Sequence, residues 1–187
     1  MKAHQKYFTV VDGAGKLMPW FVTVSNMQAP DMGTIRAGNE RVLRARLSDA
    51  RFFWESDLRT PLPERVAGLG KVVYQEKLGT YLEKVERVKE LARFVARETD
   101  GRHEEDAARA AWLSKADLVT GMVGEFPELQ GVMGRHYALV SGEKPEVADA
   151  LLEAYLPRFA GDALPPSELG AILSVAERVD SIVAIFG

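Results

Sequence analysis

The segment LEKVERVKELARFV, residues 82–95, determines the fold class. Its apolar residues recur every three or four positions, which places them on one face of a helix: Leu82, Val85, Val88, Leu91 and Val95. The residues between them alternate acid and base, and we assign them to the other faces: Glu83, Lys84, Glu86, Arg87, Lys89 and Glu90. The segment therefore predicts a long amphipathic helix that ends near Thr99-Asp100-Gly101.

The same helical period extends to both sides of this segment. From Gly38 onward it predicts a helix that ends at the prolines in 60–63 and whose apolar face holds Leu43, Leu47, Ala50 and Trp54. Further helices are expected over about 104–122, from Phe126-Pro127 onward and over 146–155. A last helix has an apolar side formed by Ile172, Val175, Ala176, Val179, Ile182, Val183 and Phe186. The predicted fold is mainly α.

Ahead of the helices, residues 6–11 and 20–25 are rich in β-branched and aromatic residues, and they flank the turn sequence DGAGK at 12–16. This pattern predicts a β-hairpin. Because a lone hairpin is marginally stable in water, we expect its strands to pair with strands outside this chain or to lie against the helices. We divide the chain into a β-hairpin segment, 1–37, and a helical domain, 38–187, and we expect truncation at both ends.

Composition restricts the functions that are open to the chain. Its 187 residues are 47% hydrophobic, which is enough for one substantial core, and they include no cysteine. No apolar run reaches membrane-spanning length, so we expect a cytoplasmic protein with no membrane partner. The formal charge of −3 means that any contact with RNA must come from a local basic patch.

Sequence motifs for catalysis or metal binding are missing. The chain has no phosphate-binding loop with its lysine, no nucleophile elbow, no HExxH and no paired CxxC. Its three histidines, His4, His103 and His136, stand on separate segments without the helical spacing of metal ligands. We therefore predict no catalytic residue and no metal site.

One basic stripe is a candidate for RNA binding. Arg41, Arg44 and Arg51 share a helix face, with Arg36 and Arg46 nearby, and could neutralise phosphates of an RNA backbone. The alternative is a solvated helix face, in which Glu55 pairs with Arg51 four residues earlier. Both interpretations remain open from the sequence.

Lys115 stands in the middle of an apolar stripe formed by Ala108, Ala111, Trp112, Val119 and Met122. An unpaired buried ammonium group costs several kcal/mol or loses its proton. We therefore expect either a nearby carboxylate or an extended side chain that carries the ammonium group to water.

Several segments resemble the β subunit of bacterial-type glycyl-tRNA synthetase, in the same order along the chain. They are GNERVLRARLSDARFFW at 38–54, RTPL at 59–62, YQEKLGT at 74–80, GEFPELQG at 124–131 and YLPRFAGD at 155–162. The resemblance implies an internal fragment of β, in which 1–37 ends an N-terminal β-containing region and 38–187 is a helical HD-like domain, incomplete at its C-terminus. It also implies an α subunit that uses the ATP, the remainder of β and tRNA(Gly) as partners, and no cofactor in this fragment.

Active HD-type phosphohydrolases bind metal through a His-Asp dipeptide, an earlier histidine and a later aspartate. By pattern, Ser114 and Lys115 stand where the dipeptide would be, and Glu177 or Asp180 stands at the late acidic position. The resemblance therefore implies a degenerate HD site made of these four residues. We hypothesise that Lys115 puts a fixed positive charge in the place of the metal, with Asp180 or Glu177 as its counter-charge.

The functional prediction is a non-catalytic part of glycine–tRNA ligase that handles tRNA and holds subunits together. Two alternatives are a metal-dependent HD-type phosphohydrolase, against which the missing ligands argue, and a purely structural scaffold. Salt-sensitive tRNA binding, metal-dependent phosphoester cleavage and partner binding without tRNA binding distinguish the three.

Overall fold

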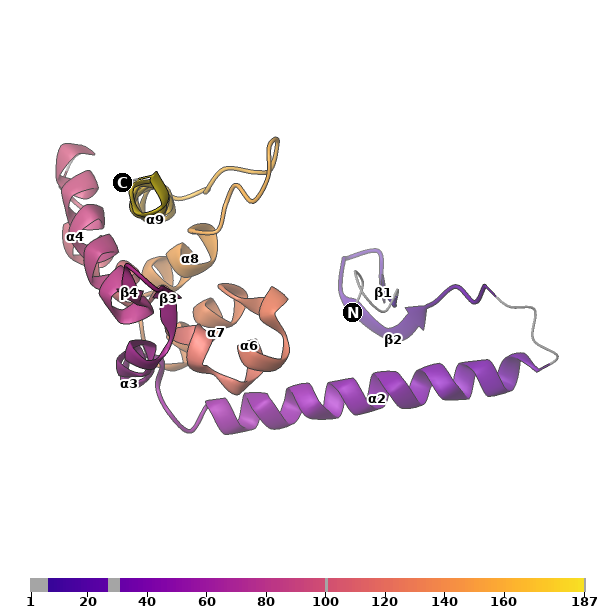
Figure 1. Ribbon diagram of the computed structural model, residues 1–187. Coiled ribbons are helices and arrows are strands. Elements are labelled where there is room, and N and C mark those ends of the chain that lie inside the picture. Colours follow the sequence, from indigo (N-terminus) through magenta and orange to yellow (C-terminus); the bar gives the residue numbers. More distant parts are fainter. Residues whose placement is uncertain (1–6, 27–30, 100, 187) are drawn as a thin grey trace. The chain divides into compact units, whose positions relative to one another are not determined.

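The computed structural model describes residues 7–26, 31–99 and 101–186, most of which are helical (Figure 1). A short two-stranded hairpin precedes the helices along the chain, so the predicted fold class is confirmed. The chain divides into two compact units, residues 1–46 and residues 47–187. Each unit has its own internal packing and is described by itself.

The first unit contains the predicted hairpin, formed by β1 (Phe8–Val11) and β2 (Leu17–Val22). The strands are antiparallel, and Phe8 pairs with Val22. In the turn, the side chain of Asp12 accepts hydrogen bonds from the backbone N–H groups of Ala14 and Lys16, both at 2.9 Å. This carboxylate fixes the chain reversal that the DGAGK sequence predicts.

The hairpin buries little of its own apolar surface. Trp20 is 66% exposed, and the other exposed apolar residues are Phe8, Val11, Leu17, Met18, Val22 and Val24. Tyr7 is the buried exception: its ring lies edge-on to that of Phe21, and its hydroxyl donates a 2.8 Å hydrogen bond to Oδ1 of Asn39. The hairpin is therefore held at its first strand and leaves most of its apolar side chains uncovered.

The long helix α2 (Met32–Asp57) begins ahead of Gly38, where helical periodicity first becomes visible in the sequence. Asp31 caps it, because its carboxylate accepts hydrogen bonds from the N–H groups of Gly33 and Thr34. Of the apolar face predicted for this helix, Ala50 and Trp54 pack against the core of the second unit. Leu47 does not, and it is 55% exposed, because core packing begins only in the last turns of the helix.

The second unit is an assembly of short and long helices. After α2 come α3 (Leu62–Arg65), the 3-10 helix η1 (Val66–Lys71) and a small antiparallel pair, β3 (Val73–Gln75) with β4 (Gly79–Thr80). The amphipathic segment forms α4 (Tyr81–Thr99), as predicted. The elements that follow are α5 (Glu104–Leu113), η2 (Ala116–Val119), α6 (Gly121–Glu125), η3 (Pro127–Leu129), α7 (Val132–Val140), α8 (Pro145–Glu153) and α9 (Glu168–Phe186).

The single helix predicted over 104–122 is wrong, because α5 ends at Leu113 and η2 and α6 follow as separate turns. The hydroxyl of Ser114 bonds back to the carbonyl of Ala111 at 2.8 Å, and Lys115 leaves helical geometry at φ −119° and ψ 3°. Thr120 then takes extended geometry as the cap of α6. Side chains that bond to their own backbone compete with the helical ladder, and apolar periodicity does not detect them.

The core of the second unit lies where α4 packs on α5 and α9, and where α8 packs on α5, α7 and α9 (Figure 1). Many of its buried residues are alanines, among them Ala92, Ala96, Ala107, Ala110, Ala111, Ala148, Ala150 and Ala176. Small side chains let helix axes approach closely, and the larger Leu113, Leu151 and Leu173 fill the space between them. This close packing brings polar residues of α4 and α9 into contact.

Candidate functional site

Lys115, the central residue of the predicted site, is buried and paired. Its ammonium group lies 3.2 Å from Oε1 of Glu177 on α9, and both side chains are 11% exposed. It also donates a 3.2 Å hydrogen bond to the hydroxyl of Tyr155 and lies 4.3 Å from the centre of that ring. Lys115 is therefore paired with a nearby carboxylate and does not extend to water, which is the first of the two arrangements expected from the sequence.

The other predicted site residues take different partners. Asp180 contacts Lys84 and Arg87 of α4, and Glu177 is buried as well. Ser114 bonds to its own helix and contributes no group to these ion pairs. Glu177 and Asp180 are three residues apart on one helix, so both carboxylates project from the same face of α9.

Lys84 was assigned to a solvent-facing side of its helix, and that assignment is wrong. Its side chain is 3% exposed, and its ammonium group lies 2.7 Å from Oδ2 of Asp180 and 3.4 Å from Oε2 of Glu177. It also donates to Oγ of Ser181 at 3.1 Å and lies 4.5 Å from the ring centre of Tyr74. Lys84 thus bridges both carboxylates of α9.

A sequence signal for Lys84 was available. The buried residues Val88, Ala92 and Ala96 follow it at successive four-residue intervals, which puts Lys84 in line with the apolar face. The alternation of acid and base around it resembles a solvated face and hides this position. We call Lys84, Arg87, Lys115, Glu177 and Asp180 the ion-pair cluster.

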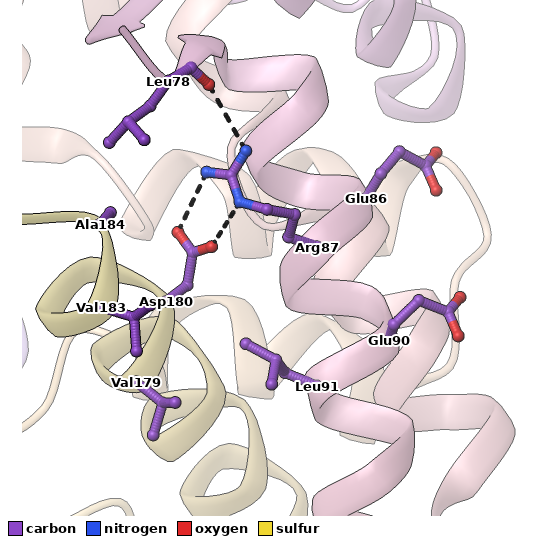
Figure 2. A pocket seen from close by; sticks show the side chains of 9 residues that line it. All are labelled: Leu78, Glu86, Arg87, Glu90, Leu91, Val179, Asp180, Val183 and Ala184. Carbon is purple, nitrogen blue, oxygen red and sulfur yellow. Dashed lines mark hydrogen bonds and ion pairs between the residues drawn. The ribbon is translucent and has the colours of Figure 1, made fainter. Parts of the chain in front are cut away.

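Within the ion-pair cluster, Asp180 receives the strongest set of contacts. Arg87 donates to Oδ1 from Nε at 2.7 Å and to Oδ2 from Nη2 at 3.4 Å (Figure 2). Burial raises the pKa of the Asp180 carboxyl, but hydrogen bonds from Arg87 and Lys84 outweigh burial and hold that pKa below its usual value. The same hydrogen bond from Arg87 raises the pKa of the guanidinium group. The Arg87–Asp180 pair is therefore ionised, and the cluster as a whole sets three basic side chains against two carboxyl groups.

Asp117 is a further buried carboxylate, next to the ion-pair cluster. It was not identified from the sequence. Its Oδ2 accepts hydrogen bonds from the N–H groups of Gly131 at 2.7 Å and Gly134 at 3.0 Å, at the start of α7. Burial raises the pKa of Asp117, and the hydrogen bond from Gly131 and the charge of Lys115 oppose that rise. Gly131 has φ of 78°, a backbone geometry that favours glycine. Asp117 holds the first turn of α7 in place.

Asp57 has the same role for α6. Its oxygens accept hydrogen bonds from the N–H groups of Gly121 and Met122, both at 2.9 Å, and from the hydroxyl of Tyr137 at 2.8 Å. A side chain at Gly121 would approach the ring of Phe53 to 2.7 Å, so this close contact needs a glycine. Both buried aspartates thus complete helix N-termini.

The geometry of the ion-pair cluster does not suit a metal ion. Within residues 7–26, 31–99 and 101–186 no three His, Cys, Asp or Glu side chains converge in a way that could hold one. The ammonium groups of Lys84 and Lys115 lie beside the carboxylate of Glu177, where a metal ion would have to bind. His4 lies outside the described residues, His103 contacts Glu168, and His136 is exposed.

The predicted arginine stripe lies along α2. In the first unit, Arg41 and Arg44 are exposed and Arg46 is half-buried. Arg41 and Arg44 have no carboxylate partner in the part of the chain that the structure describes. In the second unit, Arg51 pairs with Glu55 at 2.7 Å, and this hydrogen bond raises the pKa of Arg51. The four arginines therefore differ in how available they are to a phosphate.

Comparison with known proteins identifies the family. The family described as glycyl-tRNA synthetase beta subunit matches this sequence over residues 1–187. The chain belongs to the glycyl-tRNA synthetase β subunit family. It is 54% identical over 187 residues to the glycine–tRNA ligase beta subunit of Geobacter sulfurreducens and 56% identical over 188 residues to that of Myxococcus xanthus. The resemblance seen in the sequence is confirmed.

Both of these glycyl-tRNA synthetase β subunits align with 100% of this chain, but the chain spans only 27% of their length. The same proportion holds for the relative from Syntrophotalea carbinolica, which is 55% identical over 187 residues. The chain thus corresponds to about a quarter of a subunit in this family. Among the residues that the structure describes, no helix has the length and apolar character needed to cross a membrane.

Proposed function

We propose that this chain is a non-catalytic part of the glycine–tRNA ligase β subunit that helps to bind tRNA(Gly) and to assemble the subunits. In this proposal aminoacylation is carried out together with an α subunit, which uses the ATP. The observation that carries the proposal is the ion-pair cluster, considered with membership of the glycyl-tRNA synthetase β subunit family.

The ion-pair cluster supports the absence of hydrolytic chemistry. An HD-type phosphohydrolase activates water on a metal ion that its carboxylates and imidazoles hold. Here Lys115 lies 3.2 Å from Glu177, and Lys84 lies 2.7 Å from Asp180, so cations of the protein itself already neutralise these carboxylates. A divalent ion would have to displace two buried ammonium groups, which would then be left without counter-charge.

Arg41 and Arg44 support the tRNA-binding role. Their guanidinium groups are exposed and unpaired among the described residues, so a phosphate can approach without breaking an existing ion pair. Arg51 is a weaker candidate, because a phosphate must compete with Glu55 at 2.7 Å. The assignment therefore rests on Arg41 and Arg44 more than on the stripe as a whole.

Charge reversal in the full-length β subunit, assembled with its partner, tests this role. We expect Arg41→Glu with Arg44→Glu to weaken tRNA(Gly) binding and to flatten its salt dependence. If each arginine contacts one phosphate, the slope of log K against log salt should fall by roughly 0.7–0.9 per contact. Binding measured over a series of salt concentrations gives this slope.

Two variants serve as controls for the charge reversal. Arg158→Glu changes an arginine elsewhere on the chain, whose side chain is 66% exposed and pairs with Asp162 at 3.0 Å, and it should leave the slope unchanged. Arg51→Glu should have a smaller effect than the pair, since Glu55 already neutralises that charge. An unchanged slope for the Arg41 and Arg44 variant, in an enzyme that still assembles, would refute the tRNA role and favour a purely structural scaffold.

The hairpin supports the assembly role. Trp20, Leu17 and Val24 are exposed, and a two-stranded sheet leaves unpaired backbone groups along its edges. An exposed apolar sheet of this kind favours contact with further protein, and the chain spans only 27% of its relatives' length. The α subunit and the remainder of β are the partners that this proposal gives to the chain.

A further inference from the structure

A groove of about 780 Å³ runs between α4 and α9 (Figure 2). Its floor is apolar: Leu91 of α4 is directed toward α9, which contributes Val179, Val183 and Ala184. Arg87 and Asp180 also line it, but they satisfy each other through hydrogen bonds. We call this feature the α4–α9 groove.

The end of α9 beside the α4–α9 groove is apolar around its whole circumference. Ile182 and Val183 are more than half exposed, Ile185 is 72% exposed and Phe186 is 84% exposed. The only polar residues in these last two turns, Asp180 and Ser181, are bonded to Lys84. A helix that is apolar on all sides is normally buried, so this surface is suited to a protein contact.

The chemistry of the α4–α9 groove favours a helix over a small molecule. Small-molecule sites combine an apolar wall with several polar groups that point at the ligand. Here the polar groups of the floor are already paired, and the apolar surface continues along α9 beyond the groove. An elongated apolar surface bounded by two helices fits the apolar stripe of a third helix.

We propose that the α4–α9 groove and the apolar end of α9 bind an amphipathic α-helix from the part of the glycine–tRNA ligase β subunit that lies outside this chain. This proposal rests on the assembly role proposed above. It specifies which surface of the chain makes the contact and which kind of segment binds there. The relatives supply the source, since this chain accounts for 27% of their length. The helix would place apolar residues on Leu91, Val179 and Val183.

Charge at the rim specifies the partner further. Glu86 and Glu90 lie on the α4 side of the groove, where their side chains point away from α9, and both are about half exposed or more (Figure 2). Each pairs with a basic residue three positions later on α4, Lys89 at 2.5 Å and Arg93 at 3.9 Å, so a helix with lysine or arginine beside its apolar stripe would compete with these pairs for the carboxylates. A second copy of the same surface would instead bring glutamates against glutamates across a two-fold axis. The rim therefore favours a basic segment of the longer subunit.

Site-specific photo-cross-linking in the assembled enzyme tests this assignment. Val183→p-benzoylphenylalanine is introduced into the full-length β subunit, and the cross-linked peptides are identified by mass spectrometry. We expect a cross-link to a helical segment of the same β subunit that carries lysine or arginine and lies outside these residues. Glu86→Arg with Glu90→Arg should lower the yield of this product roughly tenfold, as loss and reversal of two exposed ion pairs predict.

The matched control is Val140→p-benzoylphenylalanine, since Val140 is 60% exposed on α7 and Val183 is 63% exposed on α9. It should not form the same product. Glu146→Arg, an exposed change on α8, should leave the yield at Val183 unchanged.

A cross-link from Val183 to the α subunit would overturn this assignment and leave the assembly role intact. A cross-link to a second β copy, or no cross-link at all, would also overturn it. Loss of tRNA binding through Arg41 and Arg44 is independent of each of these outcomes.

Discussion

Lys115 and Lys84 occupy the same ion-pair cluster, yet the sequence revealed only one of them. Lys115 interrupts a run of apolar residues, and a single charge in such a run is conspicuous. Lys84 stands among six alternating charges, where one buried member looks like its neighbours. The four-residue spacing from Lys84 to Val88, Ala92 and Ala96 places it in line with the apolar face, but the alternating charges around it hide that spacing.

A double-mutant cycle measures whether Lys115 and Glu177 are coupled. For Lys115→Met and Glu177→Gln, we expect an interaction energy of about 0.5–3 kcal/mol, since the two groups are in contact at 3.2 Å and buried. Free energies of unfolding from urea titration of the single and double variants give this value.

The matched cycle combines Lys115→Met with Asp180→Asn. Asp180 is bonded to Lys84 and Arg87, so its coupling to Lys115 should be the smaller of the two. Equal interaction energies in both cycles would mean that Lys115 interacts with the two carboxylates to the same extent. The direct Lys115–Glu177 contact would then contribute no more to stability than the longer-range interaction with Asp180.

At the scale of elements, apolar periodicity located the long helices and missed the breaks between short ones. The amphipathic segment 82–95 lies inside α4, and the last apolar run lies inside α9. The region 104–122 was predicted as one helix because its apolar residues continue across Ser114 and Thr120. The breaks coincide with local bonds from the hydroxyl groups of Ser114 and Thr120 to the backbone three residues earlier. A tertiary contact adds to them, because Asp57 accepts a hydrogen bond from the N–H group of Met122 in α6.

Asp57 provides the test at this scale. We expect Asp57→Ala to destabilise the second unit by roughly 2–4 kcal/mol, because it removes a helix cap and leaves buried N–H groups without an acceptor. Thermal or urea unfolding measures the loss.

Tyr137→Phe is the control, since it removes one of the three hydrogen bonds to Asp57 and keeps the ring stacked on Trp54. It should cost about 0.5–1.5 kcal/mol, the usual contribution of one hydrogen bond. If Asp57→Ala costs no more than Tyr137→Phe, then the cap on α6 contributes little to stability.

At the scale of the whole molecule, the pH dependence of stability reports on two buried aspartates with opposite effects. The folded-state pKa of Asp180 is lowered, so its contribution is present above the unfolded value of about 3.9 and is lost as the pH falls through the folded value. The folded-state pKa of Asp117 is raised, so its contribution to stability decreases as the pH rises through that value.

We therefore expect Asp180→Asn to reduce the acid-induced loss of stability and Asp117→Asn to increase the slope of stability against pH above about pH 4. Free energies of unfolding measured between pH 3 and pH 7 show the two slopes. Changes of the same sign in both variants would contradict the opposite pKa shifts of the two carboxyl groups.

The sequence also predicted the family and the hairpin, because both depend on residues that are contiguous in the chain. It did not predict which exposed apolar residues belong to an interface. Phe186 and Leu47 were each assigned to the apolar face of a helix, and both are exposed, as is Trp20. The sequence of these 187 residues, about a quarter of a subunit in this family, does not distinguish core from exposed apolar positions at these sites.

The position of Glu177 and Asp180 on α9 has a mechanical consequence. Their cations come from two separate segments, Lys84 and Arg87 from α4 and Lys115 from the bend after α5. The helix contacts around them combine small alanines with larger side chains such as Leu173 of α9. A shift of α9 by one turn, about 5.4 Å, would leave buried ammonium groups facing hydrocarbon. The ion pairs thus oppose axial sliding of α9, and a helix bound in the α4–α9 groove would keep its position along α4.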